Sequence, residues 1–245
     1  MIEVERDGVT ARVWLARPEQ RNAFDAGLIA AIHETFESLS RDAGLRVVVL
    51  GGRGSTFSAG ADLEWMRASL ELSHEQNLAD ARRLEAMLAA VDACPVPVIG
   101  RIQGAAMGGG AGLAACCDIA IAEPATRFAF SEVRLGLIPA TIAPFVVSKI
   151  GRSQARRLFL SGAVFDAELA LAIGLVHEVA AELDEAVDAS IAAILRAGPE
   201  AVRHAKHLLR ELPDGDMAAS IAERRASPEG QEGLRAFLER REPRW

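Results

Sequence analysis

The chain has 245 residues, of which 50% are hydrophobic and 25% are charged, and its formal net charge is −7. This composition is typical of a globular chain long enough to bury a substantial core. The net negative charge disfavours a nucleic-acid surface, because such surfaces need clustered positive charge.

The cysteines and the apolar segments indicate a cytoplasmic protein with no membrane span. There are three cysteines, and Cys116 and Cys117 are adjacent, which disfavours a disulfide between them. The first 19 residues carry charges where a signal peptide needs an apolar core. No run of uncharged apolar residues approaches the 18 or so that a membrane helix requires.

The first half of the chain alternates predicted strands and helices. Asp7-Gly8 predicts a hairpin within the first 15 residues. Apolar residues at helical spacing predict a helix over 25–40, with Asp25 as its N-cap. A short apolar strand is expected at 46–52, followed by a loop and a long amphipathic helix over about 73–91.

The second half begins with a glycine-rich turn between two strands. Strands are expected at 94–104 and 117–123, and the stretch "GAAMGGGAGLAA" between them opens a helix. Beyond about residue 140 the pattern is mostly helical, without a linker long enough to separate domains. The sequence therefore predicts an α/β core followed by a helical C-terminal module.

The glycine turn has two candidate uses, which lead to different classes of enzyme. Residues 110–115 fit the dinucleotide-binding pattern GxGxxA, which predicts an oxidoreductase that binds NAD(P)H or a flavin. That motif also needs an acid about 20 residues further on, whereas Glu123 follows Gly112 by only 11 residues. Alternatively, the free N–H groups of such a turn can stabilise an oxygen that becomes negative during a reaction. The loop "FSAGADLEWM" also follows a strand and enters a helix, so it could supply a second donor.

Several segments together resemble the crotonase superfamily of enoyl-CoA hydratases and isomerases. They are "RPEQRNAF", "FSAGAD", "QGAAMGGGAGLAACCDIAIA", "FSEVRLGLIPATIAPFVVSKIGR" and "EGQEGLRAFLERREPRW", in this order along essentially the whole chain. The resemblance implies a spiral of ββα units over residues 1–190 and a helical trimerisation region over 191–245. It also implies a homo-oligomer, a trimer or a dimer of trimers, which binds an acyl-CoA thioester.

By position, the resemblance also implies site residues. The backbone N–H groups of Ala61 and Gly109 would form the oxyanion hole for the thioester oxygen. Residues bordering the CoA moiety of the substrate would come from the first two motifs, and these are Arg21, Ala23, Ala59, Ala61, Asp62 and Leu63. CoA would enter as part of the substrate, and no separate cofactor or metal is expected.

The resemblance implies one catalytic carboxylate and a gap where a second would be. Hydratases of the family generally use two glutamates, of which one corresponds to Glu132 as the acid/base. The other position is occupied by Gly112. Because an unpaired carboxylate is costly among apolar neighbours, Glu132 is expected to be functional rather than a surface acid. Glu64 and Glu85 are candidates for a replacement carboxylate.

The most favoured activity is reversible hydration of a 2-enoyl-CoA. The wording of several segments resembles bacterial methylglutaconyl-CoA hydratases of leucine and isoprenoid breakdown. This makes 3-methylglutaconyl-CoA a candidate substrate, and Arg67 or Arg134 a candidate partner for its distal carboxylate. The alternatives are Δ3–Δ2 enoyl-CoA isomerisation, since one glutamate can shuttle a proton between carbons, and a non-catalytic protein that binds CoA esters or RNA. His204 and His207 are expected on an exposed basic helix rather than in a metal site.

Overall fold

A mostly parallel sheet forms the centre of the molecule. The computed structural model describes residues 1–212 and 214–245. Its main sheet has six strands in the order β1-β2-β3-β4-β6-β9, with β1 and β2 antiparallel and each later pair parallel. The strands are β1 (Ile2–Asp7), β2 (Thr10–Leu15), β3 (Val47–Gly52), β4 (Val98–Ile102), β6 (Ile119–Ala122) and β9 (Glu178–Val179).

The hairpin and the first helix form as their local sequences predict. Asp7 pairs with Thr10 around Gly8, whose φ of +53° suits glycine. Helix α1 (Ala26–Ser40) begins after Asp25, whose side chain accepts a hydrogen bond from the N–H of Leu28. Both predictions are confirmed.

A second, smaller sheet makes the fold a spiral. It contains β5 (Ala105–Met107), β7 (Arg127–Ala129) and β8 (Phe165–Asp166), with β5 and β7 parallel. In addition, Ser58 forms a parallel bridge with Ala106. After each of the main-sheet strands β3, β4 and β6, the chain enters the second sheet region. There Ser58, β5 and β7 lie next to one another, so each turn of the chain adds one extended segment beside the previous one. This arrangement is the predicted α/β spiral of ββα units.

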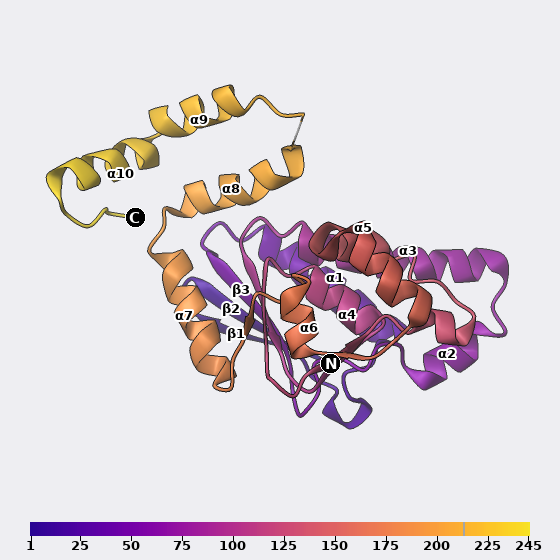
Figure 1. Cartoon of the computed structure of the whole chain (residues 1–245). Coiled ribbons are helices and arrows are strands. Elements are labelled where there is room, and N and C mark those ends of the chain that lie inside the picture. The colour runs from indigo at the N-terminus through magenta and orange to yellow at the C-terminus, as the bar shows by residue number, and fades with distance from the viewer. Residues whose placement is uncertain (213) are drawn as a thin grey trace.

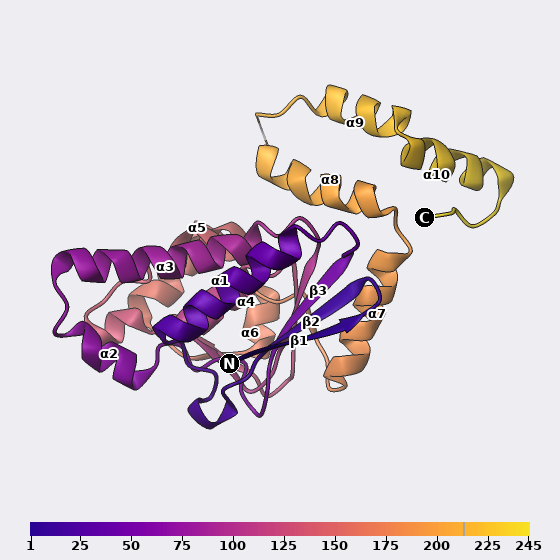
Figure 2. The same cartoon turned by 180° about the vertical axis from the view of Figure 1, so that it is seen from behind.

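Helices cover both faces of the main sheet. On one face, α1 and α3 (His74–Asp92) pack with α4 (Gly109–Ala115) and α5 (Ala143–Ser161) on Val48, Leu50 and Val98. On the other face, α7 (Leu183–Leu195) packs on the intervening residues Val47, Val49 and Ile99. Figures 1 and 2 show α7 on the opposite side of the strands from α1 and α3. Because side chains alternate along a strand, neighbouring valines of β3 serve different faces.

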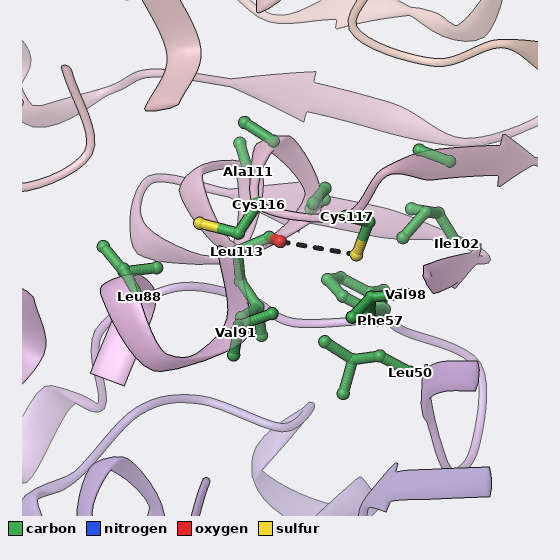
Figure 3. Close-up of a cluster of buried hydrophobic side chains, with 14 of the residues drawn as sticks. Leu50, Phe57, Leu88, Val91, Val98, Ile102, Ala111, Leu113, Cys116 and Cys117 are labelled. Atoms are coloured by element: carbon green, nitrogen blue, oxygen red, sulfur yellow. Dashed lines mark hydrogen bonds between the residues drawn. The ribbon is translucent and has the colours of Figure 1, made fainter. Parts of the chain in front are cut away.

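The adjacent cysteines belong to the core. Figure 3 shows Cys116 and Cys117 among Leu88, Val91 and Leu113, and Cys117 Sγ lies 3.6 Å from the Leu113 carbonyl oxygen. Burial raises the pKa of the Cys117 thiol to about 12. Both thiols are thus core groups with little tendency to react.

Three further helices stand outside the core. They are α8 (Pro199–Glu211), α9 (Met217–Ala226) and α10 (Pro228–Glu239), which extend beyond α7 in both views. Lys206 fastens α8 to the core by donating to Asp118 Oδ2 at 2.6 Å. None of the helices in the described part of the chain has the length and apolar character needed to cross a bilayer. The predicted division at residue 190 falls inside α7 and stays a prediction.

Candidate active site

A cavity of about 520 Å³ lies where both sheets, α4 and two outer helices meet. One wall consists of backbone from residues 59–61 and 108–109. A second wall consists of side chains from α2 (Leu63–Ser69) and α3, and the segment from Ser131 to Thr141 closes the cavity. The carboxyl ends of parallel strands are the usual place for such a site in an α/β protein.

The backbone around Ala61 presents its N–H group to the cavity. The N–H of Phe24 donates to the Gly60 carbonyl at 2.7 Å, and the N–H of Asp62 donates to the Phe24 carbonyl at 2.9 Å. Since neighbouring peptide groups of an extended segment point in opposite directions, the Ala61 N–H points away from Phe24. It has no hydrogen-bond partner among the described residues.

The N–H of Gly109 is free for a different reason. Gly109 is the first residue of α4, so its N–H has no carbonyl one turn earlier within the helix. Gly108 precedes it with a φ of +49° and donates to the Ala129 carbonyl at 2.8 Å, which fixes the turn. The predicted oxyanion pair, Ala61 and Gly109, therefore borders one cavity with both N–H groups available.

Phe24 joins the two donor loops, and sequence reasoning did not single it out. Its backbone pairs with Gly60 and Asp62, while its ring lies against Gly109: a Cβ built there would be 3.1 Å from the ring. Phe24 is fully buried. The only hint in the sequence was its place in "RPEQRNAF", since the contact spans 85 residues of chain.

Glu132 lines the same cavity as this pair of donors. It opens a short 3₁₀ turn, η2 (Glu132–Leu135), and its Oε1 lies 3.3 Å from the point where a Cβ on Gly108 would be. Its Oε2 is buried without a hydrogen-bond partner in the part of the chain that the structure describes. Burial raises the pKa of Glu132 above the ordinary glutamate range, which suits a group that exchanges protons.

Gly112 leaves no room for a second carboxylate. A Cβ built on it would lie only 2.2 Å from Cγ2 of Ile142, whose side chain is fully buried. Ile142 therefore fills the space that a side chain at position 112 would occupy. Ile142 directly precedes α5, so this space is filled from a different part of the chain.

The residues predicted to border CoA divide into two groups. Ala59, Ala61 and Leu63 line the cavity, whereas Ala23 is buried beneath it. The Asp62 carboxylate caps α2 by accepting from two backbone N–H groups of its first turn. The N–H of Ala59 donates to the carbonyl of Arg21 at 2.9 Å, which places Arg21 beside this loop.

Other predicted polar residues lie outside the cavity. Glu64 and Arg67 form an exposed ion pair with each other at 2.5 Å. Glu85 and Arg134 are exposed, and neither lines the cavity. In the described part of the chain, no group of three or more His, Cys, Asp or Glu residues could hold a metal ion.

Sequence reasoning missed Asp80, a second carboxylate that does line the cavity. Its side chain accepts a hydrogen bond from Trp65 Nε1 at 3.3 Å and forms an ion pair with Arg83. Asn77 and Leu84 line the same wall from the same helix. The helical spacing of Asn77, Asp80 and Leu84 could have identified this face of α3, but none of these residue types by itself indicates a binding site.

The whole chain is similar to known proteins. A family model described as enoyl-CoA hydratase/isomerase matches residues 5–245. A crystallised enoyl-CoA hydratase from Shewanella pealeana is 40% identical with a TM-score of 0.95, covering 100% of this chain and 95% of that one. AtuE of Pseudomonas aeruginosa is 33% identical with a TM-score of 0.94, covering 99% and 98%. Enoyl-CoA hydratase AKT6-1 of Alternaria alternata is 32% identical over 99% of this chain and 83% of its own length.

Proposed function

Because the chain belongs to the enoyl-CoA hydratase/isomerase family of the crotonase superfamily, we propose that it adds water reversibly to a 2-enoyl-CoA thioester. One observation carries the proposal. The cavity brings two unpartnered backbone donors, Ala61 and Gly109, together with the carboxylate of Glu132, whose Oε2 is buried without a hydrogen-bond partner among the described residues. Donors for a thioester oxygen beside a proton acceptor are what this addition requires.

The reaction divides into two proton transfers at one carboxylate. Glu132 accepts a proton from water while the water oxygen bonds to the β-carbon and the electrons of the double bond move to the thioester oxygen. The N–H groups of Ala61 and Gly109 stabilise that oxygen as it becomes negative. Glu132 then returns the proton to the α-carbon, the carbonyl re-forms, and the product is the 3-hydroxyacyl-CoA.

The CoA moiety is part of the substrate, and we propose no separate cofactor or metal. Leu63 lines the cavity and is 76% exposed, so the methylene groups of the pantetheine arm can pack on its side chain. A 3-methylglutaconyl group is one candidate acyl chain. Its distal carboxylate would reach the α2–α3 wall, and neither Arg67 nor Arg134 lines the cavity to receive it.

Δ3–Δ2 isomerisation is the second candidate, and the Gly112–Ile142 contact favours it. A single carboxylate is sufficient to take a proton from one carbon of the substrate and deliver it to another. Such a reaction needs no water. The two reactions would therefore share the oxyanion hole and Glu132 but differ in the mass of the product.

A panel of enoyl-CoA thioesters, with straight, branched and carboxylated acyl chains, tests these candidates. Hydration is expected to add one water to at least one 2-enoyl-CoA, with loss of the conjugated-thioester absorbance. A product of unchanged mass with a shifted double bond would instead establish the isomerase. No turnover anywhere in the panel, with retained binding of the esters, would leave a non-catalytic binding protein.

We also propose that the chain forms the homo-oligomer that the family resemblance implies. Helix α10 presents Phe237 and Leu238 with 81% and 79% of their surfaces exposed, and Ile221 on α9 is also exposed. A second copy of the chain would cover these apolar groups, which are costly to leave in water. Sedimentation equilibrium is expected to give a trimer or a hexamer, and a monomer would contradict the proposal.

A further inference from the structure

We infer that Asp80 is the second carboxylate of the site and that it accepts a hydrogen bond from the water that attacks the substrate. The inference rests on the proposed hydratase function. A water molecule that adds to a double bond carries two protons, and Glu132 takes only one of them. The other O–H needs an acceptor, since in a cavity closed by substrate an unpaired O–H is costly.

Asp80 is the acceptor that the cavity offers. Of the described residues lining it, only Asp80 and Glu132 carry carboxylates. Ionised acceptors bind protons of water more strongly than hydroxyls or amides do, which favours Asp80 over Ser131 and Thr141. The expected alternatives, Glu64 and Glu85, lie on the same helical region but outside the cavity.

The packing of α3 explains how Asp80 reaches the site. Leu88 and Val91 of α3 share a buried cluster with Ala111 of α4 and with Cys116, the residue that follows α4 (Figure 3), so α3 runs beside the helix that begins at Gly109. Asp80 is two helical turns before Leu88, on the same face. The helix that packs against α4 in the core therefore carries Asp80 to the cavity.

The contacts of Asp80 fix its position and leave acceptor sites free. Oδ2 accepts from Trp65 Nε1 at 3.3 Å, and Oδ1 pairs with Arg83, while only 15% of the side chain is exposed. A carboxylate has about four lone-pair positions, so two remain available. During the addition Asp80 only accepts a hydrogen bond: the proton that moves goes to Glu132 and then to the α-carbon.

These same contacts could serve only to join α2 to α3, so the test must separate the two roles. The first measurement is hydration of the best substrate from the panel. The second is exchange of the α-protons of butyryl-CoA with D₂O, which needs the oxyanion hole and Glu132 but no attacking water. A structural role of Asp80 would affect both measurements, whereas a role toward water affects only the first.

Asp80→Asn keeps the shape of the side chain and an oxygen that can accept from Trp65. It is expected to lower kcat for hydration by about 10- to 100-fold, the effect of losing one hydrogen bond to a charged acceptor, with KM within about threefold. The exchange rate should stay within about threefold of the wild-type rate. Glu85→Gln, an exposed acid on the same helix, should change neither rate, and Glu132→Gln should abolish both.

Hydration by Asp80→Asn within threefold of wild type would overturn the inference, as would a parallel fall of hydration and exchange. Trp65→Phe is a second variant, which keeps the Asp80 carboxylate but removes one of its donors. It should retain more hydration activity than Asp80→Asn, and the reverse order would also overturn the inference. A wild-type protein that exchanges α-protons but hydrates no enoyl-CoA would instead refute the proposed function itself.

Discussion

The cavity has two walls that are built in opposite ways. The backbone wall, residues 59–61 and 108–109, consists of strand-like and helix-starting main chain held by hydrogen bonds to neighbouring backbone. The helical wall consists of the cavity-facing side chains of α2 and α3, several of which are exposed. The first wall carries N–H donors whose identity does not depend on side chains. The second carries only side chains.

This difference separates the oxyanion donors from the side chains that contact the rest of the substrate. At two glycines of the donor loops even a methyl group is excluded: a Cβ on Gly60 would lie 2.7 Å from the Met107 carbonyl oxygen, and one on Gly110 would lie 2.8 Å from that of Ser58. Close approach of the two loops is what brings their N–H groups to one oxygen. Apart from Asp80, the helical wall tolerates change, since its apolar residues meet solvent or substrate rather than packed backbone.

The largest expected effect comes from the carboxylate that faces the backbone wall. Glu132→Gln removes the proton acceptor and keeps the size of the side chain. Hydration is expected to fall by about 10²- to 10⁴-fold, while the dissociation constant of a saturated acyl-CoA stays nearly constant. Steady-state kinetics and calorimetric titration check this, and near-normal turnover would contradict the role of Glu132.

A methyl group on the backbone wall should be almost as damaging. Gly60→Ala places a Cβ against Met107 at a φ of +89°, so the loop that carries Ala61 must shift. Loss of one oxyanion donor is expected to lower kcat by about 10²- to 10³-fold. Gly8→Ala is the control, because its φ is also positive but nothing lies within 4 Å and the site is distant. It should lose about 1–2 kcal/mol of stability and keep its activity.

The third test fills the gap at Gly112. Gly112→Glu drives its side chain into Ile142, so it is expected to lower the free energy of unfolding by about 1–3 kcal/mol, as overpacking does. Adding Ile142→Ala removes the obstructing atoms. The double variant should therefore unfold at higher denaturant concentration than Gly112→Glu alone. Equal midpoints for the two variants would show that Ile142 does not close this position.

The sequence was sufficient where local chemistry decides the structure. Asp7-Gly8 predicted the hairpin, and Asp25 predicted the start of α1, because turn and cap interactions span only a few residues. The glycine-containing loops and the family resemblance together predicted two backbone donors, whose role as an oxyanion hole stays a prediction. The structure places both of the predicted ones, at Ala61 and Gly109, on a single cavity.

The sequence was insufficient where contacts cross the fold. Ile142 fills the space beside Gly112 from 30 residues away, and Phe24 joins loops that follow different strands. Asp80 reached the cavity through the packing of α3 on α4, which helical periodicity alone does not orient. Periodicity indicates a buried face, but it does not say which partner covers each turn of that face.

Changes at the apolar positions of the helical wall should be smaller and should depend on the substrate. Leu63→Ala removes an exposed apolar side chain at the cavity mouth, so the loss of buried area on binding is partial. KM for the acyl-CoA is expected to rise by about threefold to tenfold, within the effect of one or two methylenes, with kcat unchanged. An equal fall in kcat would mean that α2 also positions the reacting atoms, which would weaken the contrast between the walls.

The smallest expected effect is on the free energy of unfolding, and the burial of Glu132 determines its direction. Burial raises its pKa in the folded protein above the unfolded value, so between these two values the folded state binds more protons. Wild-type stability therefore falls as pH rises through this window, which begins near the ordinary glutamate pKa. Because glutamine does not titrate, Glu132→Gln lacks this pH-dependent loss of stability. Its urea midpoint should be higher than that of the wild type at neutral pH, and this difference should disappear below the window. Urea titrations of both proteins across pH 4–8 measure it, and a gain independent of pH would show that desolvation of the carboxylate is not its cause.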